Sequence, residues 1–190
     1  FWKTIAKFKC SWFSAVPTQF SYILNNEEVP KDLSSLRFAR SASAPLSPDI
    51  HKKFEKRFGI PIIETMGLTE TGSQITTNPM PPGQRKIGSP GKAFGNQIMI
   101  GDDQFEALPA GETGEILVKG DNVMQGYFKQ PEETHKTILG NGWLRTGDLG
   151  YLDTDGYVFV SGRIKELIIK GGENIAPREI DEALLTHPGI

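Results

Sequence analysis

Apolar and polar positions in the first third of the chain recur with two different periods, which predicts short strands separated by amphipathic helices. The predicted strands are residues 9–16, 36–40 and 60–63. The clearest helix lies between the last two strands: Ser47 suits its N-cap, Phe54 belongs to its apolar stripe, and Gly59 ends it. Strands and helices that alternate in this way predict a parallel α/β sheet, whose ligand loops lie at the carboxyl ends of the strands.

From about residue 79 the pattern changes, because proline and glycine become frequent and the apolar runs become short. Strands are predicted at residues 97–100, 115–119 and 157–160, and a helix begins at Pro131. The segment Asp153-Thr154-Asp155-Gly156 has the composition of a turn between two antiparallel strands. This part of the chain is therefore expected to form a small antiparallel, barrel-like unit.

After Arg163 the pattern predicts a further strand over residues 164–169, then a glycine-rich loop and a helix from Pro177. The expected fold class is α/β plus β. Three parts are predicted: residues 1–80 as part of a parallel α/β sheet subdomain, residues 81–163 as the antiparallel barrel-like subdomain, and residues 164–190 as a hinge and the start of a truncated α+β C-terminal domain.

Composition and charge narrow the kinds of partner. The 21 basic and 23 acidic residues are well mixed and give a net charge of −2, so neither nucleic acid nor an anionic membrane surface is indicated. No apolar run approaches the ~20 residues of a membrane-spanning helix. Cys10 is the single cysteine, which excludes an internal disulfide and predicts a cytoplasmic protein. Both ends begin or stop in mid-pattern, so the chain is expected to be a piece of a longer protein.

The segment Glu64-Thr65-Met66-Gly67-Leu68-Thr69-Glu70-Thr71-Gly72 directly follows a predicted strand and is expected to form a strand-end loop. Its glycines allow close backbone approach, its hydroxyls can donate to a phosphate, and Glu70 offers an oxygen ligand for Mg²⁺. A capped helix start, in which Thr69 and Glu70 serve the backbone, is the alternative that the local sequence slightly favours. Ser41-Ala42-Ser43-Ala44-Pro45-Leu46 follows another strand and leaves room for a flat ring, but a tight connection before a helix cap explains it as well.

Asp148 and Arg163 are candidates for holding a sugar and its phosphate. A carboxylate can accept two hydrogen bonds from a ribose diol, and a guanidinium can donate to ribose or phosphate oxygens. The alternatives are an aspartate in a turn beside Gly147 and an arginine in a surface ion pair. For this pair the binding role is favoured.

Lys165 follows the barrel-like unit, where a change of domain is expected. A charged residue that does not pack suits a hinge that absorbs a backbone rotation. The glycines Gly171 and Gly172 leave room for an extended thiol cofactor, although a plain connecting loop explains them equally well.

The three histidines, His51, His135 and His187, are far apart in the sequence and lie on or beside predicted helices. Neither a Ser/His/Asp hydrolase site nor a zinc site is therefore expected. All three are expected to be histidines of the surface or of helix ends.

Four segments, taken together, resemble the adenylate-forming superfamily, which includes acyl- and aryl-CoA ligases, luciferases and peptide-synthetase adenylation domains. The segments are Met66-Gly67-Leu68-Thr69-Glu70, Gly114-Glu115-Ile116-Leu117-Val118-Lys119-Gly120 with its continuation to Tyr127, Trp143-Leu144-Arg145-Thr146-Gly147-Asp148-Leu149, and residues 162–179. They occur in the family's order and spacing over nearly the whole chain. The lysine at the hinge and the segment from Gly172 to Ile180 are more similar to CoA ligases than to peptide-synthetase domains.

The resemblance implies a two-step reaction. A small carboxylic acid reacts with ATP in the presence of Mg²⁺ to give an acyl-adenylate and pyrophosphate, and the thiol of coenzyme A then displaces AMP. The residues implied to bind the nucleotide are Ala44, Pro45, Glu64, Thr65, Met66 and Gly67 around adenine, and Asp148 and Arg163 at the ribose and phosphate. Thr69 is implied to act in catalysis by contacting the α-phosphate, and Glu70 by binding the metal. Lys165 is implied to be the hinge between the domains, and Gly171 and Gly172 are implied to bind CoA.

The sequence departs from the family's pattern in four respects. Met66 replaces the usual tyrosine beside adenine, and Thr65 stands where many relatives have glycine. The upstream Ser/Thr/Gly-rich phosphate loop and the downstream catalytic lysine of the family have no counterpart in the chain. Because such groups supply much of the charge stabilisation, the isolated chain is expected not to catalyse adenylation.

Two alternatives stay open for the function. One is an acyl-AMP ligase that loads the phosphopantetheine of a carrier protein instead of CoA. The other is a nucleotide-binding or structural remnant without turnover. For the acid, Phe13, Phe20 and Phe94 suggest an apolar acyl or aryl group, although each is more often a core residue.

Overall fold

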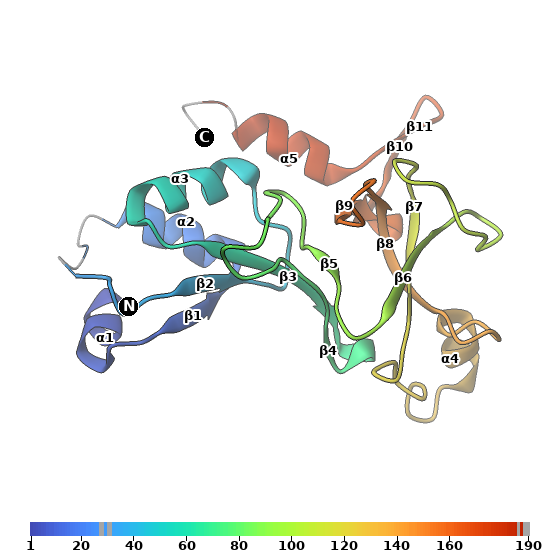
Figure 1. The fold of residues 1–190 in the computed structure, drawn as a ribbon. Helices are drawn as coiled ribbons and strands as arrows, with labels where there is room; N and C mark the ends of the chain where they lie inside the picture. The colour runs from blue at the N-terminus through green and yellow to red at the C-terminus, as the bar shows by residue number, and fades with distance from the viewer. Residues whose placement is uncertain (27–28, 30–31, 186, 188–190) are drawn as a thin grey trace.

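The computed structural model describes residues 1–26, 29, 32–185 and 187, and it contains three β-sheets (Figure 1). One sheet has five strands, one has four and one has two. The chain is thus mixed α/β, with one sheet that contains parallel strands and two that are antiparallel, which confirms the expected class at this level. Residues 186 and 188–190, at the end of the predicted C-terminal part, lie outside the described residues.

The five-stranded sheet forms the N-terminal part of the molecule. Its strands, in spatial order, are β1 (Trp12–Ala15), β2 (Phe38–Ser41), β3 (Ile62–Leu68), β4 (Ser73–Thr77) and β5 (Lys92–Ala93). The first three are parallel, and the last two pair antiparallel. The helices α2 (Pro17–Asn25) and α3 (Pro48–Phe58) cover one face of the sheet, as Figure 1 shows. Phe20 and Phe54 from these helices are fully buried with Ile62 of β3 and form the core.

Two predictions for this sheet were wrong in detail. The chain begins with the helix α1 (Trp2–Phe8), and Lys9 ends it in the left-handed conformation, so the first strand is shorter than residues 9–16. The strand β3 runs on to Leu68 because its second half pairs with β4. The segment that begins at Glu64 is therefore mostly strand, followed by the 3-10 turn η1 (Thr69–Thr71), and is not a strand-end loop.

The four-stranded antiparallel sheet follows in the middle of the chain. Its strands are β6 (Gln97–Gly101), β7 (Gly114–Lys119), β8 (Leu144–Leu152) and β9 (Val158–Arg163), and the helix α4 (Pro131–Thr137) precedes β8. The turn predicted at residues 153–156 joins β8 to β9, and the helix at Pro131 is confirmed. The strand β8, which carries Asp148, was not predicted.

The two large sheets are joined at residues 89–91. Gly91 forms an antiparallel bridge with Val158, whose amide donates to the Gly91 carbonyl at 2.9 Å. The Ser89 hydroxyl donates to the Val158 carbonyl at 2.5 Å. A Cβ atom on Gly91 would lie 2.0 Å from the backbone carbonyl of Thr77, so glycine allows the loop to pass directly over β4.

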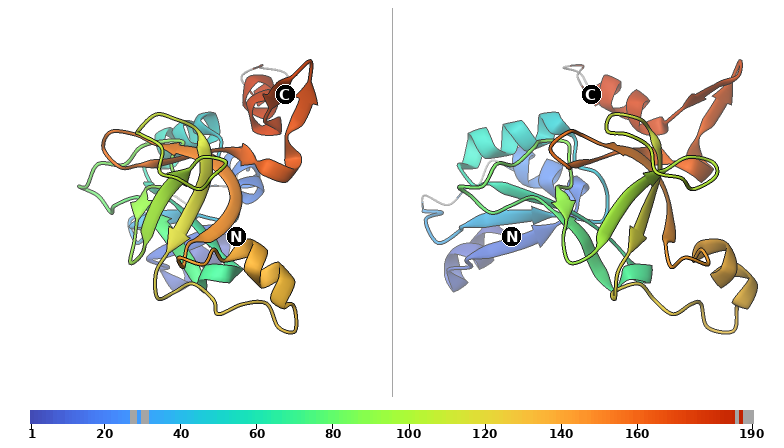
Figure 2. Two further views of the ribbon diagram at one scale, coloured as in Figure 1. Left: turned by 90° about the vertical axis from the view of Figure 1, so that its right-hand side faces the viewer. Right: turned by 45° about the vertical axis from the view of Figure 1, so that its right-hand side comes forward.

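The C-terminal segment begins where β9 ends. It consists of the 3-10 turn η2 (Ile164–Glu166), the hairpin of β10 (Ile168–Lys170) and β11 (Glu173–Ile175), and the helix α5 (Pro177–Leu185). The prediction of a strand over residues 164–169 was therefore wrong in its first half, which forms the turn η2, and the strand begins only at Ile168. The views in Figure 2 show this hairpin projecting away from both larger sheets. No helix in the described part of the chain is long and apolar enough to cross a membrane.

Candidate functional site

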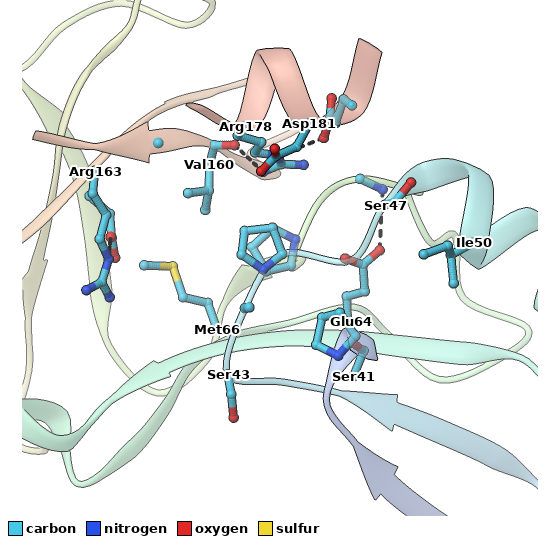
Figure 3. A pocket seen from close by; sticks show the side chains of 18 of the residues that line it. Ser41, Ser43, Ser47, Ile50, Glu64, Met66, Val160, Arg163, Arg178 and Asp181 are labelled. Atoms are coloured by element: carbon cyan, nitrogen blue, oxygen red, sulfur yellow. Dashed lines mark hydrogen bonds and ion pairs between the residues drawn. The ribbon is translucent and has the colours of Figure 1, made fainter. Parts of the chain in front are cut away.

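A cavity of about 720 Å³ lies where the two large sheets and the helix α5 meet. Its floor comes from the ends of β2 and β3 and from the loop after β2, and its sides come from β8, β9 and α5 (Figure 3). In a parallel sheet the carboxyl ends of the strands are the usual place for a ligand, which is where this cavity opens.

All eight residues predicted to bind a nucleotide line this cavity. They are Ala44, Pro45, Glu64, Thr65, Met66, Gly67, Asp148 and Arg163. The fold brings them together from four places in the sequence: the loop after β2, the strand β3, and the strands β8 and β9. Ser41 and Glu64 are register partners on the parallel strands β2 and β3 and both line the cavity.

Asp148 and Arg163 form an ion pair across β8 and β9. They are register partners, and Arg163 Nε lies 3.0 Å from Asp148 Oδ1. Asp148 is only 6% exposed, and this burial raises the pKa of its carboxyl, while Arg163 opposes the rise. The Thr146 hydroxyl accepts a hydrogen bond from the Asp148 amide at 3.0 Å and donates to the Ile116 carbonyl at 2.7 Å. Asp148 is therefore a fixed carboxylate at the cavity wall, within reach of a hydroxyl-bearing ligand.

Glu64 is the second buried carboxylate of the cavity, and its partner is His51. The imidazole Nδ1 of His51 lies 2.9 Å from Glu64 Oε1, and its Nε2 lies 3.0 Å from Glu55 Oε1. His51 is 1% exposed, so the expectation of a surface or helix-end position was wrong. The sequence contained a signal for this burial, because His51 lies three residues before Phe54 on the apolar face of α3.

Glu55 links this pair to Arg85 and to the backbone of β3. Its carboxylate accepts hydrogen bonds from Arg85, and the Ile62 amide donates to Glu55 Oε1 at 2.7 Å. Burial opposes ionisation of Glu55, but the hydrogen bonds from His51, Arg85 and Ile62 outweigh burial and lower its pKa to about 2.

We expect the low pKa of Glu55 to make the stability of the chain depend on pH. A carboxyl whose folded pKa lies below its ordinary value of 4.5 contributes stability above that value and loses it as the pH falls through about 2. Glu55→Gln should therefore lower the free energy of unfolding by roughly 2 kcal/mol at pH 6 and by much less near pH 2. Urea unfolding at several pH values measures this, and an equal loss at both ends of the range would contradict it.

Thr69 and Glu70 do not line the cavity. Thr69 is exposed in the turn η1, and the hydroxyl of Tyr127 donates to Glu70 Oε1 at 2.7 Å. Within the described residues no group of three or more His, Cys, Asp or Glu side chains could hold a metal. A single carboxylate suits Mg²⁺ only as one ligand among phosphate oxygens and water, which is the usual way this ion is held. Glu70 fits that limited role.

Lys165, Gly171 and Gly172 also lie outside the cavity lining. Lys165 is exposed in η2, directly after the last strand of the four-stranded sheet. The two glycines form the turn between β10 and β11, both have positive φ, and nothing lies within 4 Å of a Cβ placed on either of them.

Several cavity residues were not predicted from the sequence. Among them are Ser21 of α2, and Arg178, Asp181 and Glu182 of α5. Arg178 donates to the Val160 carbonyl of β9 and, through Nε, to Glu182 at 2.7 Å. Ala176 packs against Gly162, where any side chain would meet it. These contacts hold α5 over the cavity.

The comparisons with known proteins agree with this geometry. Residues 1–128 match the family model described as AMP-binding enzyme. The whole chain is 53% identical to the sulfoacetate–CoA ligase of Cupriavidus necator and 42% identical to the oxalate–CoA ligase of Saccharomyces cerevisiae, covering 37% and 35% of those proteins. The crystal structure of ATP-bound MatB from Rhodopseudomonas palustris matches 98% of this chain and 38% of MatB, with a TM-score of 0.91 and 35% identity.

The chain spans little more than a third of the length of these relatives. Two of them are named as acid–CoA ligases, and the third was solved with ATP bound. Because the family model covers more than half of this chain, and the match to the relatives runs from end to end, the chain belongs to the AMP-binding enzyme family, in its CoA-ligase branch.

Proposed function

We propose that the cavity binds the adenylate of an acid–CoA ligase reaction. The observation that carries the proposal is the convergence of Glu64, Asp148 and Arg163 on one cavity. A buried carboxylate at the wall suits the two hydroxyls of a ribose, and the exposed guanidinium beside it suits a phosphate oxygen. The sequence resemblance assigns the same positions to adenine, ribose and phosphate.

The proposed reaction has two steps. In the first, an oxygen of the carboxylic acid attacks the α-phosphorus of ATP, and pyrophosphate leaves with the electrons of the broken P–O bond. In the second, the sulfur of coenzyme A attacks the acyl carbon, its proton is lost, and AMP leaves. Thr69 is proposed to contact the α-phosphate, and Glu70 to hold Mg²⁺, which neutralises phosphate charge when bound.

We extend the proposal to the C-terminal segment. Lys165 would be the hinge, and the segment from residue 164 would belong to a small domain that turns between the two steps. In this arrangement Gly171 and Gly172 would approach the pantetheine arm. The position of α5 over the cavity supports this proposal, because a domain that turned about Lys165 would carry α5 and so change the access to the cavity. The division at residues 80 and 163, the barrel-like form of the four-stranded sheet and the cytoplasmic location remain predictions.

For the acid, we propose a small polar substrate. The apolar or aryl group suggested by Phe13, Phe20 and Phe94 gains no support, since none of the three lines the cavity. The hydroxyl-bearing side chains Thr18, Ser21, Ser41, Ser43 and Ser47 do line it. The relatives that match the whole chain at 53% and 42% identity are named for sulfoacetate and oxalate, which are small and polar acids.

The proposal is tested with a protein that carries this chain together with the parts that its relatives possess. We expect ATP-dependent thioester formation with CoA, measured with sulfoacetate, oxalate and benzoate, and faster with the first two. Thioester formation on a carrier protein but not on CoA would identify the alternative acceptor. Failure with every acid and acceptor would favour the remnant without turnover.

The 190-residue chain alone is expected to show no ATP–pyrophosphate exchange, because the groups that the family uses on the β- and γ-phosphates are not among its residues. The matched control is the longer protein, assayed with the same acid and at the same concentration. Exchange by the chain alone, at a rate near that of the longer protein, would contradict this part of the proposal.

A further inference from the structure

A buried histidine stands behind the cavity wall, in a place that the reaction scheme does not use. His51 is not part of the cavity lining, but it contacts Glu64, which is. The contact joins Nδ1 of a side chain that is 1% exposed to a carboxylate of a residue that is 4% exposed. Because both side chains are buried, this contact fixes the orientation of the imidazole ring and of the Glu64 carboxylate.

The groups around His51 favour its charged form. Glu55 of α3 faces one ring nitrogen and Glu64 of β3 faces the other, while Arg85 reaches the site only through Glu55. Burial disfavours the imidazolium, but the hydrogen bonds and charges of the two carboxylates outweigh it and raise the pKa of His51. When the ring is charged, both of its nitrogens donate, one to each carboxylate.

The interaction leaves one oxygen of Glu64 for the cavity. Oε1 accepts two hydrogen bonds, one from His51 Nδ1 at 2.9 Å and one from the Gly88 amide at 3.3 Å. Within the described residues, both hydrogen bonds of the Glu64 carboxylate go to Oε1 and none goes to Oε2. Figure 3 shows Glu64 extending up from β3 into the pocket with its carboxylate beside the loop after β2. This oxygen is a fixed acceptor in the ligand space.

We infer that His51 is a positioning residue for base selection: its contact with Oε1 fixes the orientation of the Glu64 carboxylate, so that Oε2 accepts a hydrogen bond from the 6-amino group of adenine. A 6-oxo purine carries a carbonyl oxygen at the same place, and this second acceptor is repelled by the carboxylate. The inference rests on the proposed function, because it takes the cavity to be the nucleotide site. It adds a residue outside that cavity and a pH dependence.

Binding of AMP, purine riboside monophosphate and IMP to the 190-residue chain tests the inference by calorimetry. The wild-type chain should prefer AMP to IMP by at least about tenfold, as expected for a hydrogen bond to a charged group, with purine riboside monophosphate between them. This preference should fall as the pH rises through the pKa of His51. In His51→Gln it should shrink to about threefold or less and lose its pH dependence, although glutamine can still donate to Glu64.

Two further variants test whether the loss of base preference comes from the His51–Glu64 contact or from a general effect of replacing a histidine. Glu64→Gln should lose the preference in the same way, and His135→Gln, which replaces an exposed histidine on α4, should leave the preference and its pH dependence unchanged. Equal affinities for AMP and IMP in the wild-type chain would overturn the inference. So would a His51→Gln chain that keeps both the preference and the pH dependence.

A measurement without ligand keeps the inference distinct from the proposed function. The ¹⁵N resonances of the His51 ring should titrate above the ordinary imidazole value of 6.5, and Glu64→Gln should move this titration to lower pH. If the wild-type chain binds no nucleotide, the proposed binding site fails, and the state of His51 is judged by these resonances. A titration of His51 at or below the ordinary imidazole value of 6.5, or one that is unchanged in Glu64→Gln, would overturn the role of His51.

Discussion

Replacing Asp148 by alanine is expected to weaken the binding of a non-hydrolysable acyl-adenylate mimic by about 10–100-fold. The carboxylate is buried at the cavity wall and paired with Arg163, and the backbone amide of Asp148 donates to the Thr146 hydroxyl, so the side chain is positioned before a ligand arrives. Hydrogen bonds to a charged acceptor contribute roughly 1.5–3 kcal/mol, which corresponds to this loss of affinity. Calorimetric titration of the wild-type chain and of the Asp148→Ala chain measures the difference.

Two controls isolate the ribose contact. A mimic without the 2′ and 3′ hydroxyls should bind the wild-type and Asp148→Ala chains equally well. Asp153 offers a control carboxylate, since it also forms an ion pair, with Lys86 at 2.5 Å, but it does not line the cavity. Asp153→Asn should therefore bind the mimic like the wild-type chain. A loss in Asp148→Ala that is the same for both mimics would show that Asp148 does not contact the ribose.

Replacing Gly91 by alanine is expected to reduce the stability of the fold by about 3 kcal/mol or more. The residue has φ near +97°, and the new Cβ would lie 2.0 Å from the carbonyl carbon and oxygen of Thr77, where no flexible side chain can yield. The loop would have to move away from β4, and the bridge from Gly91 to Val158 would be lost. The midpoint of urea unfolding measures the change.

Gly111 separates the clash from the backbone strain. Its φ of +90° is similar, but nothing lies within 4 Å of a Cβ placed on it. Gly111→Ala should therefore cost only about 1 kcal/mol, the strain of a left-handed alanine. Similar losses in the two variants would show that the close approach over Thr77 does not matter for stability.

The sequence predicted best those elements whose signals are local. The helix α3 begins after Ser47 and stops before Gly59, and the turn at residues 153–156 lies between two strands, all as expected. The strand β8 could not be predicted, because Gly147 and the polar residues around it give no apolar alternation. It is a strand because β7 and β9 pair with it on either side. The extension of β3 to Leu68 has the same kind of cause, since β4 folds back on it.

The residues of the candidate site were likewise predictable only in part. Asp148 and Arg163 were favoured from their chemistry, but for Glu64 and Thr65 the local sequence slightly favoured a structural role. Only the resemblance, with its four segments in order, joined them into one site. The contribution of α5 through Arg178 was out of reach, since it depends on how a distant helix lies over the cavity. Burial of His51 could have been inferred from its place on the apolar face of α3.

A crystal structure of the 190-residue chain with an acyl-adenylate mimic tests the central claim most directly. We predict that the adenosine lies in the cavity, with both ribose hydroxyls about 2.6–3.2 Å from the carboxylate of Asp148 and the base beside Glu64. A mimic seated outside the cavity, or one whose ribose lies away from Asp148, would contradict the assignment of the cavity to the adenylate.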